Sequence, residues 1–233
     1  MNSAMTSFRL KVLTAAAAMV GLASPVSAEL IVSQLVVELM SSSRTADVLV
    51  FNDADERAYI SIEPSEIVNP GTVAEKRVSN PDPRVSGLLV SSTRLILEPR
   101  QKRLLRLAAT SIPNERERVY RVTVKPVVGG VEASSSGLKL LVGYEMLVMV
   151  RPAKSGPLSV EGRRKGNELT LVNRSGASVE LIDGQRCPPA NGTCTSLSGK
   201  RLYAGASWTQ SVSPSDRVEF RALSNGKIHA LKF

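Results

Sequence analysis

The sequence predicts an all-β protein made of two immunoglobulin-like β-sandwich domains in tandem. Three observations support this prediction. Helical periodicity is nearly absent from the chain. Short runs of β-branched and aliphatic residues recur about every 8 to 15 positions, with Gly, Pro, Asn, Asp and Ser between them. A segment rich in Pro, Gly and charge, residues 151–157, divides these runs into two groups.

The first group contains seven predicted strands, enough for one immunoglobulin-like sandwich. The clearest is 119–127, because apolar and polar residues alternate there, so that one face of the strand is buried and the other faces water. The full set is 30–39, 45–51, 58–62, 87–97, 103–108, 119–127 and 138–150.

The second group follows the linker and is separated by turn sequences such as Asn173-Arg174-Ser175-Gly176. Its predicted strands are 158–161, 168–172, 178–182, 195–202, 207–212, 217–223 and 228–231. We therefore expect a first domain at residues 29–152 and a smaller second domain at residues 153–233.

Residues 1–28 have the three parts of a secretory signal peptide. These are a basic start at Arg9 and Lys11, an apolar stretch and an A-x-A-like site that ends at Ala28. The apolar stretch has about 12 residues, too few for the roughly 20 that span a bilayer. We expect cleavage after Ala28 and an exported mature chain without stable membrane insertion.

Cys187 and Cys194 both lie beyond the predicted signal peptide and would meet an oxidising compartment. The residues between them, 188–193, are rich in turn formers. A disulfide that closes a hairpin tip is the simplest interpretation. A zinc site is disfavoured, because His229 is the only histidine and there is no third cysteine. We predict no metal and no cofactor.

The charge and the motifs exclude several classes of function. Loss of Arg9 and Lys11 takes the formal charge from +9 to +7, and a basic surface can attract nucleic acid. Export, scattered Lys and Arg residues and few aromatic residues argue against a nucleic-acid partner. The sequence contains no nucleophile elbow, phosphate-binding loop or zinc-protease motif. We expect no catalytic residues and no enzyme activity.

The most unusual segment is 138–150, which is longer than the usual five or six residues of a strand. One side of its first half carries Leu138, Leu140, Val142 and Tyr144, and the other carries Lys139, Gly143 and Glu145. Two interpretations stay open. The segment is either a central core strand with an amphipathic start, or an exposed edge with apolar side chains. Such an edge promotes aggregation unless another chain pairs with it.

Four landmarks resemble the periplasmic (PapD-like) chaperones of the chaperone–usher pilus pathway. They are Leu97-Glu98-Pro99-Arg100-Gln101 before the fifth strand, Arg116-Glu117 at the sixth, Val150-Arg151-Pro152 at the end of the first domain, and Leu169-Thr170-Leu171-Val172-Asn173 in the second domain. Their order and spacing carry the resemblance, which covers most of the mature chain.

The resemblance implies a periplasmic chaperone that binds, stabilises and delivers pilus or fimbrial subunits, with an outer-membrane usher as a further partner. In this family the last strand of the first domain supplies the strand that an incomplete subunit lacks. By position, the donor residues are Leu138, Leu140 and Val142, with Tyr144 as a candidate fourth. Glu117 and Arg151 match the family's interdomain ionic contact, whose second-domain acid has no clear counterpart, since Asn225 stands near its place.

One departure concerns the subunit's C-terminal carboxylate. Classical members of the family hold it with an Arg on the first strand and a Lys on the last, but the aligned positions here fall near Val36 and on Leu147. Arg121 and Lys125 are candidate substitutes. An alternative function, an exported β-sandwich that binds a ligand or glycan without strand donation, stays open. The sequence does not identify the subunit or the oligomeric state.

Overall fold

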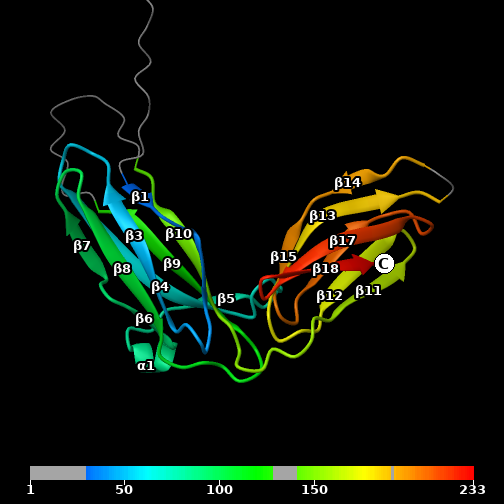
Figure 1. The fold of residues 1–233 in the computed structure, drawn as a ribbon, viewed down its shortest axis with the longest axis horizontal. Coiled ribbons are helices and arrows are strands. Elements are labelled where there is room, and N and C mark those ends of the chain that lie inside the picture. The colour runs from blue at the N-terminus through cyan, green and yellow to red at the C-terminus, as the bar shows by residue number, and fades with distance from the viewer. Residues whose placement is uncertain (1–29, 128–140, 190–191) are drawn as a thin grey trace, which may run out of the picture.

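The computed structural model describes residues 30–127, 141–189 and 192–233, and the predicted signal peptide lies outside these ranges. The chain forms two β-sandwiches that meet at an angle (Figure 1). No sheet of the described residues combines strands from before residue 151 with strands from after residue 159. The prediction of an all-β fold with two immunoglobulin-like domains is confirmed.

The first sandwich packs a four-stranded sheet, in the order β1-β3-β8-β6, against a six-stranded sheet, in the order β2-β10-β9-β4-β5 with β7 also paired to β4. The strands are β1 (Leu30–Val32), β2 (Val36–Leu39), β3 (Thr45–Asn52), β4 (Ala58–Val68), β5 (Lys76–Val78), β6 (Leu88–Val90), β7 (Arg94–Leu97), β8 (Lys102–Ala109), β9 (Arg118–Pro126) and β10 (Tyr144–Val150). A single helical turn, α1 (Pro83–Ser86), precedes β6 and is capped by Asp82. No helix in the described part of the chain is long and apolar enough to cross a membrane.

Two of the predicted strands are each divided between the two sheets. The segment 30–39 becomes β1, which pairs with β3, and β2, which pairs with β10 in the opposite sheet. The segment 87–97 likewise becomes β6 and β7. One straight strand cannot pair in both layers of a sandwich, so the chain bends between the two halves.

Strand β4 is longer than the predicted 58–62, because it continues through Pro64 to Val68. β7 pairs with one end of β4 and β5 with the other, so the proline lies where that edge has no continuous neighbour. A proline is tolerated at such a place, since it has no N–H to donate. The sequence did not predict β5, whose three residues are all exposed and therefore show no alternation.

The core of the first domain is filled by alternate residues of the two sheets. On β9 and β10 the even-numbered residues point inward: Tyr120, Val122, Val124, Met146, Val148 and Val150. The odd-numbered residues of the same strands therefore lie on the outer face of the six-stranded sheet.

The second sandwich pairs a three-stranded sheet, β11-β12-β16, with a five-stranded sheet, β14-β13-β17-β18, in which β15 also pairs with β13. The strands are β11 (Val160–Lys165), β12 (Glu168–Asn173), β13 (Val179–Cys187), β14 (Thr195–Leu197), β15 (Lys200–Leu202), β16 (Ser207–Ser211), β17 (Arg217–Ser224) and β18 (Lys227–Lys232). The predicted strand 195–202 is split into β14 and β15, which pair with different parts of β13. Leu169, Leu171, Leu181 and Phe220 belong to the core.

The predicted disulfide between Cys187 and Cys194 is present. Arg186 on β13 pairs with Thr195 on β14, and the two cysteines are the next residues toward the tip of this hairpin. The disulfide therefore closes the hairpin, as the turn-forming residues between the cysteines predict.

We expect a Cys187→Ala/Cys194→Ala variant to lose about 2–3 kcal/mol of unfolding free energy, since the bond restricts the unfolded chain over a short loop. The loss should be confined to the second domain. Calorimetry of the parent with and without reductant provides the control, and equal stability of parent and variant would contradict the expectation.

Candidate functional site

The last strand of the first domain, β10, has different neighbours along its two halves. From Leu147 to Val150 it lies between β9 and the parallel strand β2, and the Leu147 N–H donates to the Leu35 carbonyl over 2.8 Å. From Tyr144 to Met146 no described strand lies on the β2 side. β10 is therefore a central strand at its end and an open edge at its start.

The sequence-predicted donor residues lie at and before this open edge. Leu138 and Leu140 fall outside the described residues. Val142 is 47% exposed. Tyr144 is only partly exposed and packs against the core of the first domain itself. Among the described members of the set, Val142 is thus the side chain that is available to a second chain.

Arg151 follows β10 directly and lies in a buried ionic cluster. Its Nη1 donates to Glu117 Oε2 over 2.7 Å, and its Nη2 and Nε donate to the two Glu38 carboxylate oxygens over 2.6 and 3.2 Å. The Arg151 side chain is 6% exposed and that of Glu117 only 1%. Burial opposes the charged form of Arg151, but Glu38 and Glu117 outweigh it and raise the pKa of the guanidinium.

The Arg151–Glu117 pair lies entirely within the first domain, and neutral groups make its contact with the second. Ser178 Oγ accepts from Arg151 Nη1 over 3.0 Å, and the Glu117 N–H donates to the Gly176 carbonyl over 2.8 Å. Asn225, which stood near the expected second-domain acid, lies instead with its amide 3.5 Å from Ser155 Oγ. The cluster contacts the second domain through a hydroxyl and main-chain groups.

The sequence analysis did not identify Glu38 or Ser178. Glu38 could have been found, because Val37 and Leu39 face the core and the residue between them must face outward. Ser178 carries no comparable signal, since its role depends on how the second domain is placed against the first.

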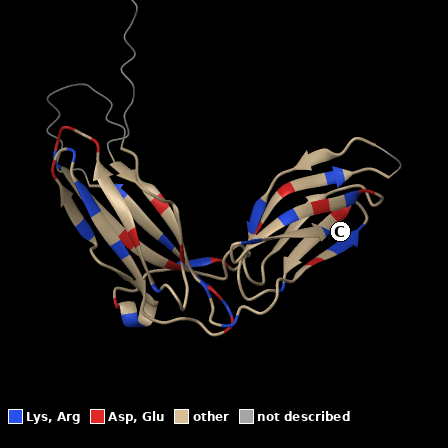
Figure 2. Ribbon diagram, in the orientation of Figure 1, with Lys and Arg blue, Asp and Glu red and all other residues tan. Residues whose placement is uncertain are grey.

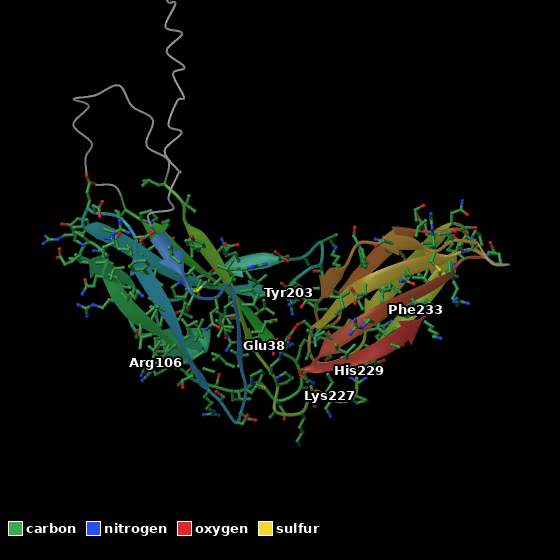
Figure 3. The ribbon with its side chains drawn as sticks, turned by 45° about the horizontal axis from the view of Figure 1, so that its top comes forward. Glu38, Arg106, Tyr203, Lys227, His229 and Phe233 are labelled. Atoms are coloured by element: carbon green, nitrogen blue, oxygen red, sulfur yellow. A yellow bond between two sulfur atoms is a disulfide. The ribbon has the colours of Figure 1, made fainter. Side chains whose placement is uncertain are left out.

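A second contact joins the domains on the outer face of the six-stranded sheet. Ile67, Val119, Leu147 and Met149 form a small apolar cluster there, and Tyr203 of the second domain packs against it. Figure 3 shows Tyr203 between the two sandwiches. This face of the sheet is therefore turned toward the second domain, and we call it the cleft wall.

The positions aligned with the family's missing basic pair do lie side by side on the cleft wall. Leu147 on β10 is the register partner of Val36 on β2 and of Arg121 on β9. The Arg121 guanidinium, about one third exposed, is 3.9 Å from Glu145. Lys125 lies farther along β9 and pairs with Glu63 over 2.9 Å. Of the two candidate substitutes, Arg121 is the one beside the expected position.

The base of the cleft carries positive charge from both domains. Arg121 of the first domain and Arg201 of the second both act on Tyr203, where burial raises the pKa of the phenol and the two guanidinium groups oppose that rise. Figure 2 shows basic residues on the strands of both sandwiches. The described residues contain no group of three His, Cys, Asp or Glu side chains that could hold a metal.

The model of a known protein family matches residues 29–156, more than half of the chain. Its description is that of the pili and flagellar-assembly chaperone, PapD N-terminal domain. This chain belongs to that chaperone family. The match includes the open strand, the Arg151 cluster and the predicted first domain, and it ends just beyond the boundary that we place at residue 152.

A curated relative supports the family assignment. This relative, a CFA/I fimbrial protein of Escherichia coli, is 37% identical over 152 residues, which cover 62% of this chain and 63% of the relative. The match thus spans less than two thirds of the relative's length.

Solved structures of fimbrial chaperones share the fold. The class 5 fimbriae chaperone CfaA superposes with a TM-score of 0.69 at 24% identity, covering 88% of this chain and 97% of its own. A chain from the Salmonella enterica complex of SafA pilin with SafB chaperone has a TM-score of 0.59 at 16% identity, with 88% and 95% covered. The likeness extends over both sandwiches.

Proposed function

We propose that this chain is a periplasmic chaperone that binds, stabilises and delivers pilus or fimbrial subunits by donating the strand that begins before β10. One observation carries the proposal: in a member of this family, the start of β10 is an open edge that adjoins an exposed Val142. The predicted signal peptide at 1–28 and the domains at 29–152 and 153–233 belong to the same proposal. It requires no catalytic residue and no cofactor.

Strand donation uses both the main chain and the side chains of the edge. A subunit that lacks its last strand has unpaired main-chain groups beside an apolar groove, and an added strand satisfies both needs. Because Tyr144 packs against the core of the first domain, we assign the groove-filling role to Leu138, Leu140 and Val142. An outer-membrane usher would then receive the loaded chaperone.

The direct test is periplasmic co-expression of this chain with an N-terminally tagged fimbrial subunit encoded beside it. We expect the subunit to be recovered in a soluble one-to-one complex, and to be degraded or aggregated without the chain. Equal recovery of soluble subunit in the absence of the chain would contradict the proposal and would favour the ligand-binding alternative.

We also propose that Arg121 anchors the subunit's C-terminal carboxylate. It lies beside Leu147 on the cleft wall, and its ion pair with Glu145 is long, at 3.9 Å. A guanidinium can bind a carboxylate through two parallel hydrogen bonds.

Arg121→Ala should reduce subunit capture about tenfold or more, which corresponds to a charge-assisted hydrogen bond of about 1.5–3 kcal/mol. Lys125→Ala, on the same strand and face, is the matched control and should capture normally. Capture should also fall when the subunit's C-terminus is amidated or extended. If Arg121→Ala captures as well as the parent, the anchor is elsewhere.

A further inference from the structure

Three exposed apolar residues lie in one row across three strands of the six-stranded sheet. Tyr59 on β4 is the register partner of Ile96 on β7, and the Val127 N–H, just past β9, donates to the Tyr59 carbonyl over 2.7 Å. Ile96 is 55% exposed, Val127 49% and Tyr59 48%. Scattered apolar residues are normal on a protein surface, but neighbours in one row form a patch.

Leu141 extends this row toward the open strand. β10 is in register with β9 from Tyr144, the partner of Val124, and continuing that register places Leu141 opposite Val127. Gly143 supports the continuation, because a Cβ built on it would lie 3.1 Å from the Lys125 Cβ. Leu141 is 38% exposed. We call Ile96, Tyr59, Val127 and Leu141 the apolar row.

The apolar row lies on the cleft wall, at the end distant from the second domain. Its residues are odd-numbered on β9 and β10, like Arg121, Leu147 and Met149, and Met149 and Leu147 are in the cluster that Tyr203 covers. Val142 and Tyr144 have the opposite parity, so their side chains belong to the core side of the sheet.

A strand added at the open edge would lie directly beside the row. Alternate side chains of such a strand point to the two faces of the extended sheet, and those on the cleft wall become cross-strand neighbours of Leu141. A bound subunit therefore has a way to cover the row that does not involve its groove.

We propose that the apolar row is a second contact surface for the fimbrial subunit, which presents apolar side chains to it from the strand paired with β10 and from the adjoining surface. This inference rests on the proposed function. The subunit would be held from two sides of one sheet: its groove takes Val142 and the residues before it, and its opposite face covers Leu141 and the row.

The test is a Tyr59→Thr/Ile96→Thr variant, because threonine keeps the strand propensity and removes most of the apolar surface. We expect an unchanged melting temperature and a dissociation constant for the subunit that is about tenfold higher. Leu104→Thr is the matched control: Leu104 is a 61% exposed leucine on β8 in the other sheet, and it should bind as the parent does.

Labelling distinguishes direct contact from an indirect effect. The described residues contain no free cysteine, so Ile96→Cys or Leu104→Cys introduces one reactive thiol. Bound subunit should slow maleimide labelling at position 96 and leave position 104 unchanged. If the parent captures subunit but the double variant binds equally and position 96 stays reactive, the row proposal is wrong. If the parent captures no subunit, the proposed function itself fails.

Discussion

Leu140→Glu and Val142→Glu should each abolish recovery of the fimbrial subunit while leaving the melting temperature of the free chain unchanged. Full burial of one Leu or Val side chain contributes about 1.5–3 kcal/mol. The substitution removes that contribution and also places an unpaired carboxylate in an apolar groove, which costs several kcal/mol more. A combined loss above about 3 kcal/mol weakens binding more than a hundredfold.

The free chain should tolerate these changes, because Val142 is 47% exposed before any partner binds. Surface substitutions of this kind usually change stability by no more than about 0.5 kcal/mol. Thermal melting of the free chain and subunit recovery by co-purification must therefore be measured together.

Two further variants make this test specific to the open edge. Met146→Glu changes a residue of the same parity that is fully buried, and it should unfold the first domain. Leu104→Glu places a carboxylate on the other sheet and should leave both melting and capture unchanged. Unfolding of the free chain by Val142→Glu would show that this residue belongs to the core, and the donor assignment would then be wrong.

Arg151→Ala should lower the free energy of unfolding by about 3–5 kcal/mol, the typical result of removing one partner from a buried ion pair. The substitution leaves Glu117, whose side chain is 1% exposed, without its cation. It also removes the hydrogen bonds to Glu38 and to Ser178 of the second domain. The loss should appear in denaturant unfolding and should be accompanied by faster proteolysis between the domains.

Arg106→Ala is the matched control for the buried cluster. Arg106 pairs with Asp47 over 2.7 Å, but its side chain is 63% exposed, so removal should cost less than about 1 kcal/mol. The contrast separates burial from pairing as the source of stability. If Arg151→Ala and Arg106→Ala unfold at the same denaturant concentration as the parent, the cluster does not stabilise the domain contact.

Much of the fold could be predicted because alternation reports which face of a strand is buried. In 119–127 the polar Arg121, Thr123 and Lys125 alternate with Tyr120, Val122 and Val124, and the structure places the second set in the core. The disulfide hairpin followed from the turn-forming residues between its cysteines. These features depend on neighbours in the sequence and need no knowledge of the rest of the chain.

The sequence did not predict how 30–39 and 87–97 divide between two sheets. Each half of 30–39 contains apolar residues for the core, and both sheets bury their inner faces against it. Alternation is the same whichever sheet a strand joins, so the assignment of β1 to β3 and of β2 to β10 depends on long-range pairing.

By itself, the sequence determined the two β-sandwiches, the faces of their strands and an unusual last strand in the first domain. Only the tertiary structure decided which half of that strand is open, and it did so by placing β2 against Leu147–Val150. It also explained why alternation ends after Met146: Tyr203 covers Leu147 and Met149, so both faces of β10 are buried there. A local pattern records whether a side chain is buried, whereas the identity of the covering group is set by residues distant in the sequence.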